Sequence, residues 1–497
     1  MKNIVIRLFM FFMYLLIVNF GISQTEERKQ ARVDNLLLIK KNTLDQNLYE
    51  LNSSLFNELK SSVNNITIQF PLNDEIVDLN LTRVNSEFTN YKIQTSSGRT
   101  FERNYSNHYR GKVKGNDSSV VALSIYNNYI QGLISVTGLP VISFKNSENG
   151  LVVTNYEKES SIINCYTDPR YQNDLLEELY NNLGVRKHEK VEPQGYEIMA
   201  GGNHLEIYVE ADFGMYQNLG SSVSNVENYI VGLFNQVGSL YFNEEIYIQI
   251  SEIFVWDTFD SYNVNLVQGL DDFVSNRSSF DGDLALLLSY IVGNSDPDDV
   301  SNAGGIANGI GGLCETSNPN LSPHSHINIF PDFELFPTFS RQVKVVAHEI
   351  GHNLGSRHTH ACVWNGNNTA IDGCGSCMET VDGTGCNGCL DPGNPILGGT
   401  IMSYCDREDV GIDFSLGFGQ QPGTIIRNFV NSALCLDCDL TTVDYSINID
   451  SRIEACDVIF NNVSIGNNSD VVVLPTGTVN IQGTFEAQLG SSLEIRN

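Results

Sequence analysis

The stretch His348-Glu349-Ile350-Gly351-His352-Asn353-Leu354-Gly355-Ser356-Arg357-His358 decides which fold and chemistry this chain is expected to have. Its first two histidines are four residues apart, so on a helix both imidazoles lie on one face and can hold one metal ion. Gly355 can adopt a positive φ and end the helix, so that the chain turns back and brings in His358 as a third ligand. Three neutral nitrogens leave one tetrahedral position open, which is the pattern of a catalytic zinc.

Glu349 supplies the chemistry of this motif. It follows the first ligand, His348, and is placed to take a proton from a metal-bound water, so the motif predicts metal-assisted peptide hydrolysis. A bare H-E-x-x-H also occurs as two surface histidines on a polar helix face. The longer form with its glycine and third histidine is much rarer, and it favours the zinc site.

A second element, Thr400-Ile401-Met402-Ser403-Tyr404-Cys405, lies about forty residues downstream, where a methionine turn would stand in such an enzyme. Met402 would then form an apolar floor beneath the zinc ligands. Without the histidines it would be interpreted as an ordinary core methionine.

Composition and the first residues indicate an exported protein. The 497 residues include 29 basic and 59 acidic ones, a formal charge of −30 that opposes nucleic-acid binding. Residues 1–23 have the basic start (Lys2, Arg7) and short apolar run of a secretory signal peptide; an uncleaved membrane anchor is the alternative. No later segment approaches a spanning length, so we expect a secreted protein without a transmembrane segment in its mature chain. We also expect the protein to be a monomer.

The cysteines also fit export. Ten of the 11 fall between Cys314 and Cys456, and six of these form C-x-x-C pairs, which in a cytosolic protein would suggest a second zinc or a redox site. In an exported chain disulfides are the better interpretation, although their pairing cannot be deduced from sequence. Cys165 stands alone before them. Its thiolate could occupy the open zinc position before maturation, or it is a buried, inert thiol.

The first part of the chain carries no catalytic constellation. We expect a polar helical segment from Glu26 to about Lys60, then strand-like runs such as 119–125 and 129–134, and hence a mostly β module. Residues 173–193 are polar and charged and look like a linker open to proteolysis.

Beyond this linker, strand and helix patterns alternate. We expect strands at 204–212, from 246 and at 284–288, and helices at 223–241, 266–274 and from an N-cap near Ser340 to Leu354. The glycine-rich residues 304–310 are a candidate edge strand that could pair with an extended substrate, or a surface loop.

Taken together, residues 204–435 resemble the catalytic domain of adamalysin/reprolysin-type (ADAM-like) metzincins. The resemblance depends on H-L-E-I-Y-V-E-A-D at 204–212, D-L-A-L-L-L at 283–288, the G-G-I-A…G-G-L-C segment ending at Cys314, the zinc motif and the methionine turn. Upstream, H-Y-R-G-K-V-K-G at 108–115 and S-S-V-V-A-L-S at 118–124 are similar to the propeptide of that family.

The resemblance implies a secreted zymogen of bacterial type, with an α/β (α+β) metzincin domain that contains a twisted mixed sheet and a zinc helix. It implies Zn2+ ligation by His348, His352 and His358, with Glu349 as the base. The domains expected are a signal peptide (1–23), a β-rich propeptide and linker (24–193), the metalloprotease domain (194–439) and a small all-β module (440–497).

Some residues depart from the family pattern. Thr359 stands where an aspartate usually follows the third histidine, and the residues around Cys165 do not match the usual cysteine-switch sequence. Tyr404 follows the methionine as in serralysin- and astacin-like metzincins, and either reaches the metal, steadies the transition state or packs in the turn. The family often binds Ca2+, for which Glu206 and Asp283 occupy the matching carboxylate positions.

Residues 440–497 contain short β runs separated by glycines, which suggest a small β-sandwich or a few solenoid-like turns. This module could bind a surface or glycan, serve export, or only stabilise the chain.

We therefore expect a zinc metalloendopeptidase that cuts peptide bonds in extracellular proteins. The alternative is a catalytically silent adhesion or scaffold protein that keeps the fold. A metal-independent hydrolase is disfavoured because no G-x-S-x-G elbow is present.

Overall fold

The computed structural model describes most of the chain between residues 31 and 495. The segments left out are 41–47, 61–64, 73–74, 85–87, 89, 128–129, 147–150, 157–164, 166–170, 182–195, 200–203, 291–303, 316–317, 319, 330–337, 368, 376–391, 408–409, 434, 437–439, 444–445, 448–450, 456, 467–468 and 476–478. The expected signal peptide, residues 1–23, lies outside the described residues. Within them, no helix has both the length and the apolar character needed to cross a membrane.

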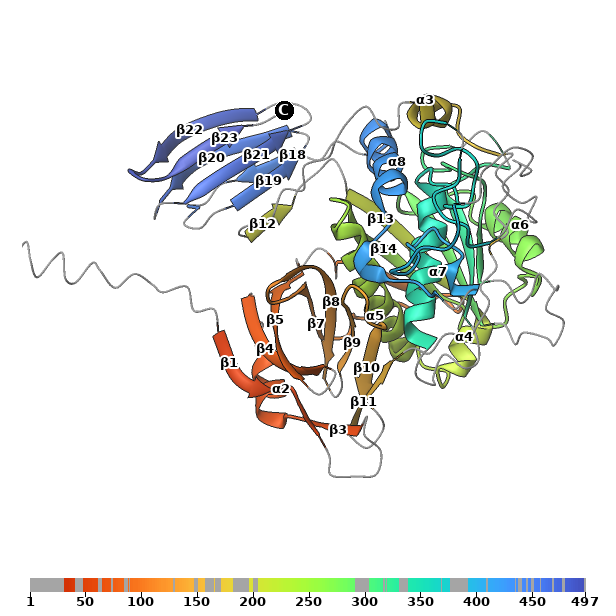
Figure 1. The fold of residues 1–497 in the computed structure, drawn as a ribbon, viewed down its shortest axis with the longest axis horizontal. Coiled ribbons are helices and arrows are strands. Elements are labelled where there is room, and N and C mark those ends of the chain that lie inside the picture. Colours follow the sequence, from red (N-terminus) through yellow and green to blue (C-terminus); the bar gives the residue numbers. More distant parts are fainter. Residues whose placement is uncertain are drawn as a thin grey trace, which may run out of the picture.

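The N-terminal module is built on a 10-stranded sheet, shown in red and orange in Figure 1. Its strand order is β1-β4-β5-β7-β8-β9-β10-β11-β3-β2, and most pairs are antiparallel. The elements are β1 (Ala31–Leu36), β2 (Leu38–Lys40), β3 (Leu48–Leu51), α2 (Ser53–Leu59), β4 (Asn65–Leu72), β5 (Glu75–Arg83), β7 (Ser106–Val113), β8 (Asn116–Tyr126), β9 (Ile130–Ser135), β10 (Ile142–Asn146) and β11 (Leu151–Tyr156).

The expected helix from Glu26 to Lys60 is wrong for most of its described residues, which form β1, β2 and β3. Only the last turn or two, α2, is helical, and the side chain of Asn52 caps it by accepting from Leu55 N. The apolar run Leu36-Leu37-Leu38 explains the difference. Leu37 and Leu38 are buried in the core of this sheet, so long-range strand pairing overrides the local helical pattern.

The second sheet carries the expected alternation of strands and helices. Its order is β16-β17-β15-β13-β14-β6, with β16 antiparallel to β17 and the other pairs parallel. The strands are β6 (Lys92–Thr95), β13 (His204–Ala211), β14 (Tyr247–Val255), β15 (Leu284–Tyr290), β16 (Gly305–Ala307) and β17 (His324–Ile329). β15 is buried on both faces, as expected for a central parallel strand.

The helices of this region are α3 (Leu175–Asn181), α4 (Phe213–Asn218), α5 (Val223–Phe242), α6 (Leu266–Asn276), α7 (Thr338–Asn353) and α8 (Gln420–Ser432). The predicted helices at 223–241 and 266–274 are confirmed by α5 and α6. The predicted helix ending at Leu354 is confirmed as α7, but it begins at Thr338, so Ser340 lies inside its first turn and is not the N-cap. Of the candidate edge strand at 304–310, residues 305–307 form a strand, the short β16 at one end of the sheet.

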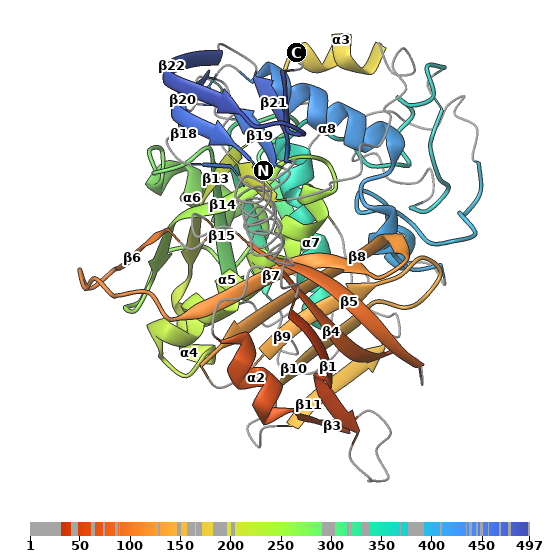
Figure 2. The same ribbon diagram turned by 90° about the vertical axis from the view of Figure 1, so that its left-hand side faces the viewer.

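α5 lies between the two sheets (Figures 1 and 2). Its stripe of Ile230, Leu233 and Val237 packs into the core of the second sheet, here also called the catalytic sheet because the zinc motif follows it in the chain, as the helical spacing predicts. Its opposite face meets the N-terminal sheet, where Asn235 Nδ2 donates to Leu123 O at 3.2 Å. A Cβ on Gly232 would lie 1.3 Å from Gln131 Nε2, so glycine is needed for this close approach.

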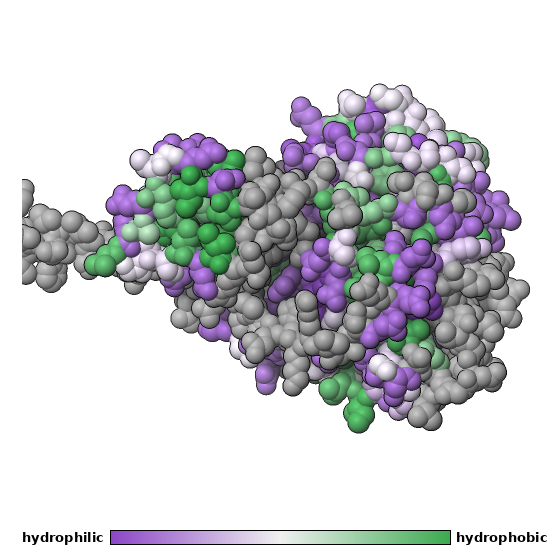
Figure 3. Space-filling view, turned by 90° about the horizontal axis from the view of Figure 1, so that it is seen from above, coloured by the Kyte–Doolittle hydropathy of each residue, from purple (hydrophilic) through white to green (hydrophobic). Residues whose placement is uncertain are grey.

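The C-terminal module consists of two small parallel sheets, shown in blue in Figure 1 except for β12, which is olive-yellow. One contains β18 (Leu440–Val443), β20 (Asp457–Ile465) and β22 (Val479–Ala487); the other contains β12 (Tyr196–Met199), β19 (Ser451–Ala455), β21 (Asp470–Pro475) and β23 (Ser492–Ile495). From β18 onward, successive strands alternate between the sheets, as in solenoid turns. Figure 3 shows hydrophobic side chains gathered on this module, and β22 and β23 expose Ile481 and Ile495.

Asp212 makes the stability of this fold depend on pH. It caps α4 by accepting from Met215 N at 2.6 Å, and burial raises its pKa to about 7 despite backbone hydrogen bonds from Met215 and Tyr290. Because the folded state then holds a proton that the unfolded state has released, stability falls as pH rises from about 4 to about 7.

We expect Asp212→Asn to flatten this dependence, because the neutral amide keeps a capping oxygen and does not titrate. Melting temperatures measured between pH 4.5 and 8 check this. Parallel curves for the variant and the unaltered chain would contradict the role of Asp212.

Candidate metal centre

Helix α7 and the turn after it position the three histidines. His348 and His352 are one turn apart on α7, and Gly355, with a φ of 90°, ends the helix. Ser356 N donates to Gly351 O at 2.9 Å, which closes the turn that leads to His358. All three imidazoles are buried.

The three Nε2 atoms converge on one point. Their separations are 3.2 Å for His352–His348, 3.1 Å for His352–His358 and 3.0 Å for His358–His348. Three nitrogens bound to a tetrahedral zinc at ~2.0–2.1 Å would be about 3.3 Å apart. The triangle therefore fits a zinc ion with little adjustment.

The hydrogen bonds at Nδ1 assign the tautomers of two ligands. His348 Nδ1 lies 2.8 Å from Ile401 O, and His352 Nδ1 lies 2.8 Å from Ser356 O. A carbonyl can only accept, so both Nδ1 atoms carry the proton and both Nε2 atoms present a lone pair. Two facing lone pairs do not form a hydrogen bond, so the short Nε2 separations indicate a site made for a cation. Burial, reinforced by the charge of Lys344, lowers the pKa of His348 and keeps it neutral, as a ligand must be.

Glu349 lies beside the ligands with its carboxylate buried. Its Oε2 atom accepts from the thiol of Cys165 at 3.5 Å, a sulfur contact. Glu349 also packs against the edge strand β16, where a Cβ on Gly305 would lie 2.7 Å from Glu349 Cγ. Gly305 therefore leaves the space that the Glu349 side chain occupies.

The methionine turn packs under α7. Met402 is fully buried, and its sulfur would lie 2.7 Å from a Cβ on Gly351. Its carbonyl accepts from Thr359 N at 3.2 Å, next to the third ligand. The turn thus contacts both the helix that carries two ligands and the segment that carries the third.

Tyr404 lies against the ligand rings, with its ring centroid 4.5 Å from that of His358. Its hydroxyl donates to Cys165 O at 3.1 Å and accepts from Cys165 N at 3.3 Å. In this structure the hydroxyl therefore contacts the Cys165 backbone.

Cys165 is not part of a disulfide, and its side chain is buried next to the three histidines. Its sulfur, with the ligand nitrogens of His348, His352 and His358, forms a group whose atoms lie within 4.8 Å of one another. The backbone of Cys165 forms a parallel bridge with Gly305 of β16. Cys165 is the one cysteine in the first half of the sequence, and it lies at the three histidines that form the candidate metal-binding group.

Tyr171 and Gln172 also contact the region around the histidines. Ile310 N donates to Tyr171 O at 2.7 Å, and Arg357 donates to Gln172 Oε1 at 2.7 Å. The expected open linker at 173–193 is wrong for 175–181, which form α3. Leu176 of α3 is buried against Gly355, where the zinc helix ends.

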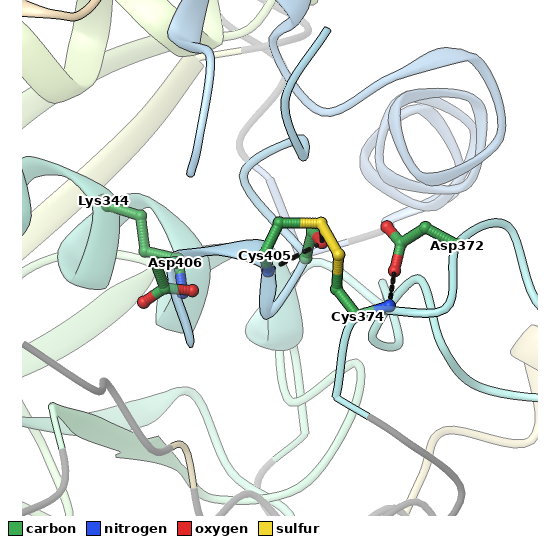
Figure 4. Close-up of a disulfide and its surroundings, with 6 residues drawn as sticks. Lys344, Asp372, Cys374, Cys405 and Asp406 are labelled. Atoms are coloured by element: carbon green, nitrogen blue, oxygen red, sulfur yellow. Dashed lines mark hydrogen bonds and ion pairs between the residues drawn. A yellow bond between two sulfur atoms is a disulfide. The ribbon is translucent and has the colours of Figure 1, made fainter. Parts of the chain in front are cut away.

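Two described disulfides link parts of this region, Cys314–Cys435 and Cys374–Cys405, and Cys362 is also disulfide-bonded. The predicted disulfides are confirmed, and neither Cys374 nor Cys435 pairs within its own C-x-x-C. Cys374–Cys405 joins the segment after His358 to the methionine turn (Figure 4).

Several supporting residues were missed from the sequence. Lys344 is buried one turn before His348, and its ammonium is 3.4 Å from Asp406 Oδ1 (Figure 4). Trp364 Nε1 donates to His358 O at 2.8 Å. The i, i+4 spacing of Lys344 and His348 could have indicated from the sequence that Lys344 lies next to His348. No local sequence signal indicates the contact of Trp364 with His358.

The candidate calcium residues do not form a metal-binding group. Glu206 Oε1 accepts from Gln249 at 2.5 Å, and Asp283 Oδ2 accepts from Glu206 N at 2.8 Å. Among the described residues, the groups with metal-ligand geometry are the histidines with Cys165, and Asp372 with the two cysteines of a disulfide. Calcium at Glu206 and Asp283 is therefore not supported.

Comparisons with known proteins found three similarities. Residues 202–410 match a reprolysin-type model described as Metallo-peptidase family M12. Disintegrin and metalloproteinase domain-containing protein 12 of Mus musculus is 23% identical over 378 residues, which cover 71% of this chain and 38% of the mouse protein. A crystal structure of metalloproteinase-II from Bacteroides fragilis aligns over 68% of this chain and 95% of its own, with 15% identity and a TM-score of 0.33.

The family match confirms the resemblance to reprolysin-like metalloproteases, and it falls on the region that holds the zinc motif, β13 to β17 and the methionine turn. The chain spans well under half of the length of the mouse protein.

Gly305 offers a test of how Glu349 is positioned. Gly305→Ala should displace the Glu349 side chain and reduce peptide hydrolysis by about 10- to 100-fold, with zinc content unchanged. The Gly305→Ala variant and the parent chain to which it is compared should both carry Cys165→Ser, so that the thiol is removed from the site. Equal activity of the alanine variant and its parent would refute this role of Gly305.

Proposed function

We propose that this protein is a secreted zinc metalloendopeptidase, made as a zymogen, that cuts peptide bonds in extracellular proteins. The observation that carries the proposal is the triangle of buried histidine nitrogens, 3.0–3.2 Å apart, with the Glu349 carboxylate beside it. The disulfides support export, because such bonds persist in oxidising surroundings.

His348, His352 and His358 would hold the ion through Nε2. A bound zinc ion would supply a lowered water pKa and a polarised peptide carbonyl. Glu349 would take up the proton at its carboxylate and later pass it to the leaving amine. Its buried surroundings strengthen these electrostatic interactions, because little water screens them.

The edge strand β16 is the proposed binding strand for substrate. It pairs with β17 on one side only, and on the other side its Gly305 bridges to Cys165. An extended peptide can add to such an edge through main-chain hydrogen bonds. A protein substrate would thus occupy the position that the Cys165 segment holds in the precursor.

We further propose that Cys165 keeps the precursor latent. Its sulfur lies among the ligand nitrogens and contacts Glu349, so the thiolate would take the open coordination position and displace the water. Bonds from Tyr171, Gln172 and Asn173 to the catalytic region hold this segment in place. Cleavage in the linker after α3 would be the step that allows the segment to leave.

A catalytically silent adhesion or scaffold protein is the second candidate. The elements expected for activity, namely the ligands, Glu349, Met402 and the edge strand, lie together in the described structure. Casein hydrolysis that is abolished by a chelator and restored by zinc would separate the two candidates.

Glu349→Ala tests the proposed base. The variant should retain zinc, because Glu349 is not a ligand, and should lose peptide hydrolysis by about 10²- to 10⁴-fold. Zinc content is measured together with casein hydrolysis. Near-normal turnover in a zinc-loaded variant would refute the assignment.

Cys165→Ser tests latency. The hydroxyl is a much weaker zinc ligand than a thiolate, so the uncleaved full chain should become at least about tenfold more active than its unaltered counterpart. A gel confirms that both chains are intact, and the double variant Cys165→Ser/Glu349→Ala should remain inactive. If the serine variant is as latent as the unaltered chain, Cys165 does not block the site.

A further inference from the structure

Residues 90–104, here called the arm, lie between β5 and β7 in the chain but pack on the catalytic region rather than on the N-terminal sheet (Figure 2). The centre of the arm, β6, pairs in parallel register with Glu252–Val255 of β14. The pairing continues where Ser96 N donates to Val255 O at 3.0 Å. The arm therefore binds by strand addition, at the end of the sheet opposite β16.

Asp257, just beyond β14, receives the turn that follows β6. Its Oδ1 atom accepts from Ser97 N and Ser96 Oγ, both at 2.9 Å. Its Oδ2 atom accepts from Ser97 Oγ at 2.6 Å and from the guanidinium of Arg99. The Asp257 side chain is only 1% exposed, whereas that of Arg99 is 55% exposed.

All side-chain partners that the described structure gives Asp257 come from the arm. Burial by itself would raise the pKa of Asp257, but the hydrogen bonds from Ser97 and Arg99 lower it well below its usual range. A buried carboxylate of the catalytic region thus depends on this one segment for its hydrogen bonds.

The rest of the arm contacts the catalytic region through buried apolar side chains and through opposite charges. Tyr91 and Ile93 are buried in the catalytic core, and Tyr91 OH donates to Glu227 at 2.7 Å. Lys92 pairs with Asp281 at 2.5 Å. From residue 92 to 103 the arm carries three basic residues and one acidic residue, in a chain whose net charge is −30.

We propose that the outer edge of β14, with Asp257, is a peptide-binding site for extended basic segments, separate from the metal centre. The arm is its occupant in this structure, and a peptide of the same sequence binds there when the arm is displaced. Because β14 and β16 lie at opposite ends of the sheet, one peptide can occupy this site while another lies at β16. The binding does not depend on zinc chemistry, so it is testable in an inactive chain.

The experiment uses the full chain carrying Glu349→Ala. Ile93→Asp and Arg99→Ala displace the arm, and a fluorescein-labelled peptide of residues 90–101 is added. We expect saturable binding by fluorescence anisotropy, at least about tenfold weaker with the arm in place or after a further Asp257→Ala. Asp281→Ala is the matched control. It should change the affinity less, because that ion pair is exposed. A peptide with Arg99→Glu should bind poorly.

Absence of binding to a folded, arm-displaced chain, or binding that Asp257→Ala leaves unchanged, would overturn the proposal. If the arm-displaced chain does not fold, the proposal is tested instead by hydrogen exchange on the chain that keeps its own arm in place. Asp257→Ala should then speed exchange of amides 93–97 about tenfold or more, with β13 and β15 still protected. Unchanged exchange in the arm would refute the site.

Discussion

The structure depends on holding three buried imidazoles with their lone pairs aimed at one point. Nothing in the histidines themselves favours this arrangement, because facing lone pairs repel. The carbonyls of Ile401 and Ser356 fix two of the rings through Nδ1, and Trp364 binds the carbonyl of the third ligand. Each of these groups comes from the methionine turn or from the residues after the helix, so both segments must be held against α7.

The links that hold them are distributed around the methionine turn. The disulfide Cys374–Cys405 ties it to the segment after His358, and the buried pair of Lys344 and Asp406 ties it to α7. Replacing Gly351 by a larger residue would push Met402 away, so close helix–turn packing is also required. The metal-binding geometry is therefore a property of several segments together, and not of the motif alone.

The N-terminal module and the catalytic region share α5 but use its two faces differently. The face toward the catalytic sheet is apolar, whereas the face toward the N-terminal sheet carries Asn235 and the glycines at 232 and 238. A polar face tolerates water after a partner leaves, and an apolar face does not. This asymmetry fits the proposed zymogen, in which the N-terminal module would be attached in the precursor and would separate afterwards.

The sequence alone determined what depends on local spacing and on side-chain type. Positions four apart on a helix give two ligands on one face, Gly355 ends that helix, and the regular apolar patterns predict α5, α6 and the buried strands. The sequence did not reveal the strands at 31–51, because their pairing with β3 and β4 is long-range. Only the tertiary structure brought Cys165 to the histidines, placed β6 on β14 and paired Lys344 with Asp406. Such contacts join residues far apart in the chain, and periodicity carries no information about them.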